Sequence, residues 1–556
     1  MRSQPSSRLG TYALAALLLW LVGYPLLITL LEALGGPRAW TLAHFAQFFG
    51  RPDEWLALWR SLWISAVSVV LAAAVGIPLA FLFERAEFPG RRLLAALIAL
   101  PVALPPLVGV IAFLFLYGES GFATRFVQHA LGLAEPPWRL LGPAAILLVH
   151  AYSMYVYFYL FTRAGLARLD AALLEASASL GASKLRTLTR VTLPLLAPAF
   201  TGAALLTFMT SLASFSAPYL FGGTFRVMTT QVVASKLNGE TALSQVETVM
   251  LAALALLGLW ALRWSERRSG SVAGGVRGVA PSRRALRNPL ARWGTAVLGY
   301  LLAALLLLPH AVLILVSFVP PFTWTVETIP PVLDLRNYQG LFAAAERLRP
   351  VLNSLWMATA ATLGALILGI AAARAAAGRG GRPTGRLGEA VETLVAVPWA
   401  IPGTVFAVAL ATTFSVNQPW VGRFLLIGTP WILPLAYMVR NLPITGRAAI
   451  AGARQLDPAL EEAAASLGAG RARRLWRVVL PMLRPALAAG AGLAFITALG
   501  DLVTSIVLYT FDTRPISIEI LSSLRLQDLG LAATYGVLLM TASTLAFLLW
   551  GRGEAR

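Results

Sequence analysis

Long apolar runs separated by short polar segments make up most of the chain. Each run of about 20 residues is long enough to cross the hydrocarbon core of a membrane as a helix. The first set of runs covers residues 11–32, 60–83, 92–117, 143–162, 198–222 and 246–263, and the second set covers 294–318, 352–374, 389–414, 427–445, 486–510 and 531–550. This pattern predicts an all-α polytopic membrane protein with about twelve transmembrane helices.

A polar, glycine-containing and basic segment separates the two sets of apolar runs. Its composition is typical of a linker. We therefore predict a first six-helix domain at residues 1–263, a cytoplasmic linker at 264–292 and a second six-helix domain at 293–556. Six is an even number of crossings, so both halves enter the membrane in the same direction and form a parallel repeat.

Only 13% of the residues are charged, whereas about 25% are charged in an average soluble domain. A soluble multidomain protein is therefore excluded. The formal net charge is +20, and every basic residue is arginine except Lys184 and Lys236. The arginines gather in alternate connecting segments, so the positive-inside rule places those segments and both termini in the cytoplasm. We attribute the charge to orientation in membrane lipid, and we expect no nucleic-acid partner.

The third span of each half carries a matching pair of prolines. Pro101 and Pro105 in the first half return as Pro398 and Pro402 in the second. A proline removes a backbone donor and interrupts a helix, which a membrane protein tolerates where the backbone lines other protein or a water-filled cavity. These prolines could be gating hinges or packing kinks, and we favour kinks.

The strongest repeat lies between the fourth and fifth spans of each half. In both copies a glycine follows six residues after a glutamate, and the proline of a Leu-Pro pair follows thirteen residues after that glycine. The two copies are offset by 287 residues throughout. The matching positions are Glu175, Ala176 and Gly181 in the first copy and Glu462, Ala463 and Gly468 in the second.

Each copy of this loop is expected to form two short helices. Asp170 and Asp457 suit the N-cap of the first helix, and Pro458 suits its first turn. The glycine can end that helix in a left-handed conformation or let another backbone approach closely. One such loop is also typical of an amphipathic connector lying on the membrane. Two copies with identical spacing favour a dedicated docking element.

The pattern Glu-Ala-Ala/Ser, with glycine six residues after the glutamate and then Leu-Pro, resembles the EAA loop of permease subunits of bacterial ATP-binding-cassette importers. The resemblance implies that each loop is a coupling helix that sits in a cleft of an ATPase subunit. It also implies two copies of a cytoplasmic ATP-binding subunit and a periplasmic substrate-binding protein as partners. Ser177 in one copy corresponds to Ala464 in the other, a mild departure from the pattern. The fused layout looks most like the ferric-iron and thiamine branch of that family.

The chain lacks the sequence Gly-x-x-x-x-Gly-Lys-Ser/Thr that cradles the phosphates of ATP. Neither lysine fits it, because Lys184 follows Ser183 and Lys236 follows Ser235. ATP hydrolysis is therefore expected in a separate subunit, and this chain is not expected to be an enzyme. The four histidines are scattered and there is no cysteine. We therefore predict no catalytic, metal or cofactor site, and interpret the histidines as core or interface residues.

One carboxylate lies well inside a predicted span. Asp501 comes about fifteen residues after the start of its span, which places it past the bilayer centre. A buried carboxylate is costly in lipid and is commonly functional. The repeat places Ser214 at the equivalent position of the first half. We predict that Asp501 and Ser214 face a translocation path; the alternative is that Asp501 pairs with another helix or lies at the membrane interface.

These features favour the transmembrane subunit of an ABC importer that moves a small solute from the periplasm to the cytoplasm. By resemblance of the fused layout, ferric iron is the expected cargo, with thiamine, polyamine or aminoethylphosphonate as alternatives. An ion-coupled secondary transporter would also suit two parallel halves. The repeated loop and the small number of buried charges argue against it. A membrane-embedded enzyme would need a cluster of polar residues at one depth, which the sequence does not show.

Overall fold

The computed structural model describes residues 5–36, 40–99, 105–269, 283–285, 288–324, 327–377 and 385–551. Within these residues nearly every element is a helix, and two strands of two residues each are the exception. Ten of the described helices are long and apolar enough to cross a membrane, or eleven when one bent pair is counted as a span. The predicted all-α, multi-span fold is confirmed.

The elements follow the chain in two series. The first series is α1 (Pro5–Leu18), η1 (Leu19–Gly23), α2 (Tyr24–Ala33), α3 (Ala43–Gly50), α4 (Pro52–Arg85), β1 (Ala86–Glu87), α5 (Arg91–Ala99), α6 (Pro106–Tyr117), α7 (Phe122–Ala130), α8 (Gly142–Ala167), α9 (Ala171–Ser179), α10 (Lys184–Thr187), η3 (Leu188–Thr192), α11 (Leu193–Leu212), α12 (Ser216–Phe221), α13 (Met228–Leu237) and α14 (Thr241–Ser269). The second series, which follows β2 (Arg284–Ala285), is α15 (Pro289–Ser317), α16 (Arg336–Ala343), α17 (Ala345–Ala377), α18 (Arg386–Ala400), α19 (Gly403–Thr413), η5 (Pro419–Val421), α20 (Ile432–Gln455), α21 (Pro458–Ser466), α22 (Arg471–Arg474), η6 (Leu475–Val479), α23 (Leu480–Leu499), α24 (Ser505–Leu508), α25 (Ile516–Arg525) and α26 (Leu529–Gly551).

The span predicted at 92–117 contains two helices, α5 and α6. Residues 100–104, and with them Pro101, lie outside the described residues. Pro105 is the N-cap of α6 and Pro106 is its first residue. A proline is well tolerated there, because the first backbone N–H groups of a helix have no partner within the helix. Pro105 and Pro106 therefore start α6 and do not lie inside a helix.

Two other predicted spans break at equivalent places in the repeat. The span at 198–222 breaks after α11 ends at Leu212 and before α12 begins, and the span at 486–510 breaks after α23 ends at Leu499 and before α24 begins. After the second break, the backbone N–H of Thr504 donates to the Asp501 carboxylate at 2.7 Å. Short polar side chains offer the backbone such alternative partners and so compete with helix formation. The two breaks place polar groups in the interior of the protein.

The remaining difference concerns the fourth span of the second half. The span predicted at 427–445 corresponds to α20, which is not among the ten candidate membrane helices. This helix carries Arg440, Arg447 and Arg454, which lower its mean hydropathy. The structure therefore retains a helix at each predicted span, although α20 is more polar than the apolar run alone suggested.

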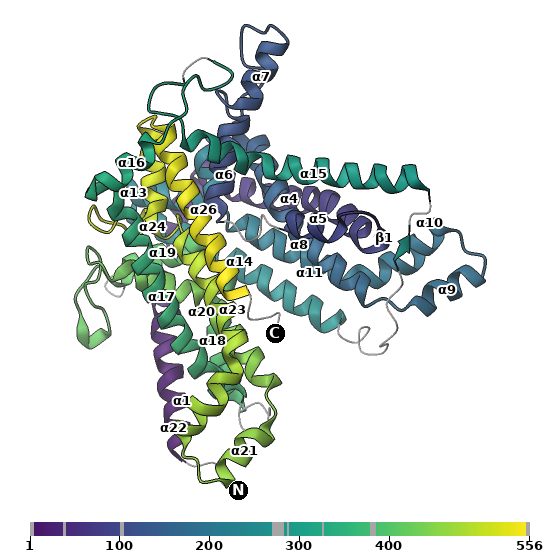
Figure 1. Cartoon of the computed structure of the whole chain (residues 1–556). Coiled ribbons are helices and arrows are strands. Elements are labelled where there is room, and N and C mark those ends of the chain that lie inside the picture. Colours follow the sequence, from purple (N-terminus) through teal and green to yellow (C-terminus); the bar gives the residue numbers. More distant parts are fainter. Residues whose placement is uncertain are drawn as a thin grey trace.

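The first helices of the two series are exchanged in space. Figure 1 shows α1 beside the green helices of the second series, and α15 lying along the blue helices of the first. Trp20 Nε1 donates to the Gly422 carbonyl at 3.1 Å, and the Tyr24 hydroxyl donates to the Val421 carbonyl at 2.5 Å. In the other direction, α15 contacts α5 and α6. The molecule has two arms, one formed mainly by the helices of the first series and one mainly by those of the second (Figure 1). Each arm is therefore completed by a helix from the other half of the sequence.

Packing is continuous between the two series, and the outside is apolar. The largest buried cluster joins Leu107 and Phe215 of the first series to Leu410 and Leu433 of the second. Large apolar side chains on the outer faces of the long helices remain exposed, including Leu257, Leu301, Ile367 and Leu549. Such a surface is unfavourable in water and suits the hydrocarbon core of a membrane.

The described part of the predicted linker lies on the first series. Strands β1 and β2 pair in parallel, with Ala86 opposite Arg284. Arg283 Nη2 lies 2.8 Å from Oε1 of Glu84, and Arg163 Nε lies 3.3 Å from Oε2 of the same carboxylate. Helix α14 runs to Ser269, so its end extends into the predicted linker. The domain boundaries themselves stay a prediction.

Candidate functional site

The two repeated loops form matching projections. In the first, the Asp170 carboxylate accepts the Ala172 N–H at 3.0 Å and caps α9. In the second, the Asp457 carboxylate accepts the Ala459 N–H at 2.9 Å and caps α21. The capping roles predicted for both aspartates are confirmed. A side-chain cap satisfies one of the backbone donors that a helix start leaves open.

The glycine of each copy ends its helix as predicted. Gly181 has φ +74° and Gly468 has φ +78°, in the left-handed region that glycine adopts without steric cost. Their N–H groups donate to the carbonyls of Ala178 and Ala465 at 2.9 and 3.0 Å. No neighbouring atom would lie within 4 Å of a Cβ added at either glycine. The space next to both glycines is therefore open to a partner.

The projections make few contacts with the rest of the chain. Neither α9 nor α21 contains a buried residue. The predicted docking residues Glu175, Ala176, Glu462 and Ala463 are all exposed. Figure 1 shows the two projections at the tips of different arms, well apart from each other.

An apolar residue stands directly before each glycine. Leu180 and Leu467 are both 88% exposed, and they occupy the same position in the two copies. A leucine in water forgoes about 1.5–3 kcal/mol that burial would release. Sequence reasoning passed over these leucines, although their repetition in the motif was visible. The two copies thus expose the same large apolar side chain at the same position.

The one departure within the motif has a local structural reason. The Ser177 hydroxyl lies 2.9 Å from the Thr187 hydroxyl and so ties α9 to α10. Ala464 cannot make this bond in the second copy. In both copies a five-residue π-helix follows, η3 or η6, and leads directly into a long helix, α11 or α23. Each projection is thus continuous with a helix that ends at one of the interior breaks.

Asp501 lies at the break after α23 and is paired with an arginine of another helix. Its side chain is 4% exposed, and it forms an ion pair with Arg440 of α20. Thr504 bonds both partners through its hydroxyl, at 3.2 Å in each case. The alternative in which Asp501 pairs with another helix is therefore what the structure shows. A place for Asp501 on a translocation path stays a prediction.

The guanidinium of Arg440 occupies a space that a glycine leaves free. A Cβ at Gly403 would lie 2.6 Å from the Arg440 Cζ atom, so a side chain there would collide with it. Gly403 begins α19, directly after the 109° bend between α18 and α19. Pro398 lies within α18 and Pro402 is the N-cap of α19. The Asp501–Arg440 pair is thus packed against the bent span of the second series.

Ser214 lies at the equivalent break of the first series, in a cluster of serines around a histidine. Its hydroxyl is 2.9 Å from Nε2 of His150, a residue that is only 1% exposed. Nδ1 of His150 lies 2.9 Å from the Ser68 hydroxyl and 3.1 Å from the Ser211 hydroxyl. His150 is therefore the buried core histidine that was predicted. Ser214 and Asp501 occupy two separate clusters.

Arg440 is the interior residue that sequence reasoning missed. It is an isolated arginine in the middle of an apolar run, and the next run contains the isolated Asp501. Opposite charges buried in adjacent spans commonly pair, because each alone would be costly in lipid. That rule offered a signal for this pair. Among the described residues, no group of three or more potential metal ligands gathers anywhere.

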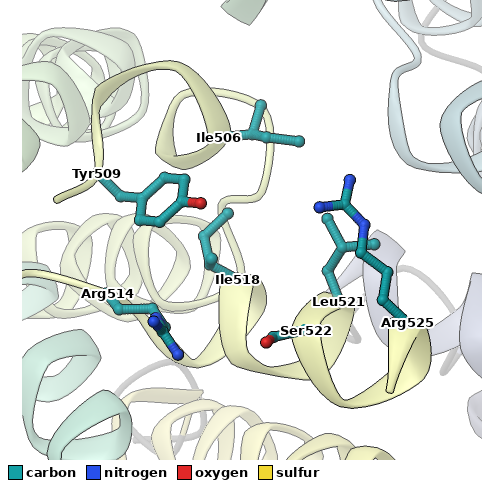
Figure 2. A pocket seen from close by; sticks show the side chains of 7 residues that line it. All are labelled: Ile506, Tyr509, Arg514, Ile518, Leu521, Ser522 and Arg525. Carbon is teal, nitrogen blue, oxygen red and sulfur yellow. The ribbon is translucent and has the colours of Figure 1, made fainter. Parts of the chain in front are cut away.

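A cavity of about 90 Å³ lies between α24 and α25. Figure 2 shows the polar side chains around it, which are Tyr509, Arg514, Ser522 and Arg525. Arg514 forms an ion pair with Glu519 at 2.9 Å. The apolar residues that complete the lining are Ile506, Ile518 and Leu521. Arg514 and Arg525 make the rim of the cavity basic, and Glu519 neutralises the charge of Arg514.

Comparison with known families identifies the class of this protein. Residues 72–271 and 365–552 each match the family described as binding-protein-dependent transport system inner membrane component. The chain belongs to this family, which supplies the permease subunits of ABC importers, and it contains the family's domain twice. It is therefore a multi-pass membrane permease. Members of the family work with a substrate-binding protein.

Three relatives illustrate the range of the family. The probable ABC transporter permease protein y4fN of Sinorhizobium fredii is 31% identical over 89% of this chain and 86% of its own length. The ferric transport system permease protein FbpB of Actinobacillus pleuropneumoniae is 28% identical over 90% of this chain and 71% of its own length. The molybdenum transport system permease protein ModB of Escherichia coli is 29% identical, covering 40% of this chain and 97% of its own length.

Proposed function

We propose that this chain carries ferric iron across the inner membrane, with one ATP-binding subunit docked on α9 and a second on α21. The supporting observation is the pair of projections, which share their caps, their left-handed glycines and their exposed leucines, Leu180 and Leu467. Two like surfaces at the ends of two arms suit two copies of one partner.

Energy would enter through these projections. ATP binding closes the two ATP-binding subunits onto each other and so draws α9 and α21 together. Each projection continues through η3 or η6 into α11 or α23, and a helix transmits such a displacement along its length as a nearly rigid body. Rocking of the two arms would then switch access from one face of the membrane to the other.

The orientation follows from the arginine-rich segments. The projections and both termini lie in the cytoplasm, and the opposite end, with α7, α13 and α25, faces the periplasm. A periplasmic binding protein would dock on that end. Ser214 and Asp501 lie at the inner ends of α11 and α23, at breaks between helices. We place them beside the route that the cargo follows.

Ferric iron as the cargo rests on the relatives that share the fused layout. The ferric permease of A. pleuropneumoniae aligns with 90% of this chain, across both halves. The molybdenum permease aligns with 40% of it, about one half. Thiamine, polyamine and aminoethylphosphonate remain the alternatives within the same importer class.

The experiment is uptake by the full chain in proteoliposomes with its ATP-binding subunits and its loaded binding protein. In the double variant Gly181→Val, Gly468→Val, the valines disfavour the left-handed conformation and fill the open space beside both glycines. We expect ATP-dependent uptake to fall at least about tenfold, which corresponds to 1.4 kcal/mol of lost docking energy. Membrane insertion should be unchanged.

Gly132→Val is the matched control, because Gly132 also has φ +63° with open space around it but lies at the opposite end, after α7. Normal transport by the double variant would contradict the docking assignment. The same vesicles test the cargo, since ferric iron should be transported and thiamine, polyamine and aminoethylphosphonate should not. Uptake that continues without ATP and stops when ion gradients are dissipated would instead identify a secondary transporter.

A further inference from the structure

Four polar side chains gather inside the first series, away from the projections and from the two breaks. They are Glu54 of α4, Gln231 and Ser235 of α13, and Glu247 of α14. All four are buried, and the two glutamates are the most enclosed, with Glu54 1% and Glu247 0% exposed. Two carboxyl groups at this depth are unusual, because an ionised carboxylate is strongly destabilised without water or a positive partner.

Each of these carboxyl groups has one oxygen bonded and one oxygen free. Gln231 Nε2 donates to Glu54 Oε1 at 2.9 Å, and the Ser235 hydroxyl donates to Glu247 Oε1 at 2.7 Å. The Oε2 atoms of both glutamates are buried without a hydrogen-bond partner. Gln231 and Ser235 are four residues apart on α13, so they lie on the same face of that helix and hold the two carboxyl groups side by side. Two buried carboxyl groups, each with one free oxygen, therefore lie next to each other.

The surroundings do not neutralise two negative charges. Within the part of the chain that the structure describes, neither glutamate takes part in a salt bridge. Glu240, which precedes α14, is paired with Arg51 at 3.0 Å. Arg226 lies 3.5 Å from Gln231 Oε1, and Lys236 follows Ser235 on the outer part of α13. Helices α11 and α19, which also contact α14, carry no charged residue in their sequences, and Glu32 of α2 is paired with Arg423.

At the equivalent place, the second series contains an acidic side chain that is paired with an arginine. The structural repeat aligns α13 with α25, α14 with α26, and α4 with α17, and places Arg347, Glu519 and Tyr535 where the first series has Glu54, Gln231 and Glu247. There the Tyr535 hydroxyl donates to the Arg347 carbonyl at 2.6 Å, and Glu519 has its own guanidinium from Arg514. In the first series the arginine aligned with Arg514 is Arg226, which bonds Gln231 instead, so among the described residues neither Glu54 nor Glu247 has a guanidinium of its own.

We propose that Glu54 and Glu247 bind one proton between them, so that the first series contains a proton-binding site that the second series lacks. The proton sits on one Oε2 and is donated to the other, which satisfies both free oxygens and leaves one delocalised negative charge instead of two. Gln231 and Ser235 stabilise that remaining charge. The shared proton therefore stabilises the packing of α4 against α14. The hydrogen bonds from Gln231 and Ser235 attach α13 to both helices.

The consequence is that the packing of α13 and α14 on α4 depends on pH. The proton belongs to the folded arrangement, so its stabilising effect is present when the pair is protonated and is lost as pH rises and the proton leaves. Two ionised carboxylates would then repel each other in the interior. This inference is independent of the cargo and of the docking surfaces, and it holds whichever solute the protein transports.

Infrared spectroscopy of the purified full chain in lipid nanodiscs provides the direct test. A protonated carboxylic acid gives a carbonyl band that carboxylates and amides lack, and ¹³C-labelled glutamate assigns the band to this residue type. We expect the band in the wild type near neutral pH and its disappearance on alkaline titration. It should be absent from Glu247→Gln, which keeps a hydrogen-bonding group there without the titratable proton.

Thermal unfolding of the same samples provides the second readout. The wild-type midpoint should fall by several degrees between neutral and alkaline pH, whereas Glu247→Gln should show a flat profile over that range. Glu519→Gln, the acid that is ion-paired in the second series, is the matched control and should keep the wild-type slope. Glu54→Gln serves in place of Glu247→Gln if the latter does not fold.

Three outcomes would overturn the proposal. The first is a wild type with no glutamic-acid carbonyl band at neutral pH, a result that needs no variant at all. The second is an unfolding midpoint that responds to added sodium or calcium but not to pH, which would identify a metal cation as the occupant. The third is a wild-type pH profile that Glu247→Gln and Glu54→Gln reproduce unchanged.

Discussion

The two series have the same order and arrangement of helices, but they bury different polar side chains. The hydroxyl of Ser61 accepts the N–H that begins α13, and the hydroxyl of Ser354 accepts the N–H that begins α25, at 2.8 Å in both cases. At the breaks, however, the first series buries His150 among serines, whereas the second buries the ion pair of Arg440 and Asp501. Under the proposed function the projections are alike because both would meet the same partner. The interiors meet only their own neighbours, and so are free to differ.

Removing one partner from the charged interior should have the largest effect. In Asp501→Ala the guanidinium of Arg440 loses its buried counter-ion, which costs about 3–5 kcal/mol of stability. In Ser214→Ala the His150 ring loses one hydrogen bond, worth about 0.5–1.5 kcal/mol. Unfolding midpoints in the same detergent measure both variants. Equal losses would remove the difference between the two interiors.

A compensated variant separates stability from transport. The pair Arg440→Met, Asp501→Leu replaces both charges with apolar groups, and we expect it to recover most of the stability that Asp501→Ala loses. Uptake should remain impaired, if Asp501 lies beside the cargo route. Full uptake by an Asp501→Ala protein that assembles normally would refute the predicted role of Asp501 in the path.

The exposed leucines test whether the two projections are equivalent. Leu180→Ala and Leu467→Ala each remove a side chain that a docked subunit would bury, worth about 1.5–3 kcal/mol, or roughly 10- to 100-fold in affinity. We expect equal losses in the two variants, measured as binding of the ATP-binding subunit to nanodiscs. Leu131→Ala, an exposed leucine at the opposite end, is the control. Strongly unequal losses would show that the two arms do not contact like surfaces.

The linker contact should give the smallest effect. Arg283→Ala removes an ion pair to Glu84, whose carboxylate keeps Arg163. Because Arg283 is partly exposed, the loss should be at most about 1 kcal/mol. Arg454→Ala, which removes a comparable pair with Glu392 in the second series, should cost as little. A loss of several kcal/mol for Arg283→Ala alone would mean that the linker contact holds the first arm together.

Local features of the docking loops followed from the sequence alone. The capping by Asp170 and Asp457 and the left-handed Gly181 and Gly468 depend on residues within one turn of each other. The spacing of the motif therefore contained all the information needed. The same holds for the long apolar helices, whose composition and length already specify a membrane span.

Contacts between distant segments were not accessible in this way. Asp501 was recognised as an interior carboxylate, but its partner lies 61 positions away on another helix. Glu54 and Glu247 attracted no notice, because each stands near the start of a long helix, where a charged residue is ordinary. Only packing of α13 and α14 on α4 brings the two carboxyl groups together, where Gln231 and Ser235 bond them.

The sequence by itself determined the class of the protein, its two series of spans and the local structure of both projections, because hydropathy, capping and glycine conformation act over a few neighbouring residues. Tertiary structure alone decided that the first helix of each series completes the other arm, and which buried charges are paired. Those outcomes depend on burial, since the free energy of a carboxylate or a guanidinium is set by the groups that replace its water, and these come from elsewhere in the chain.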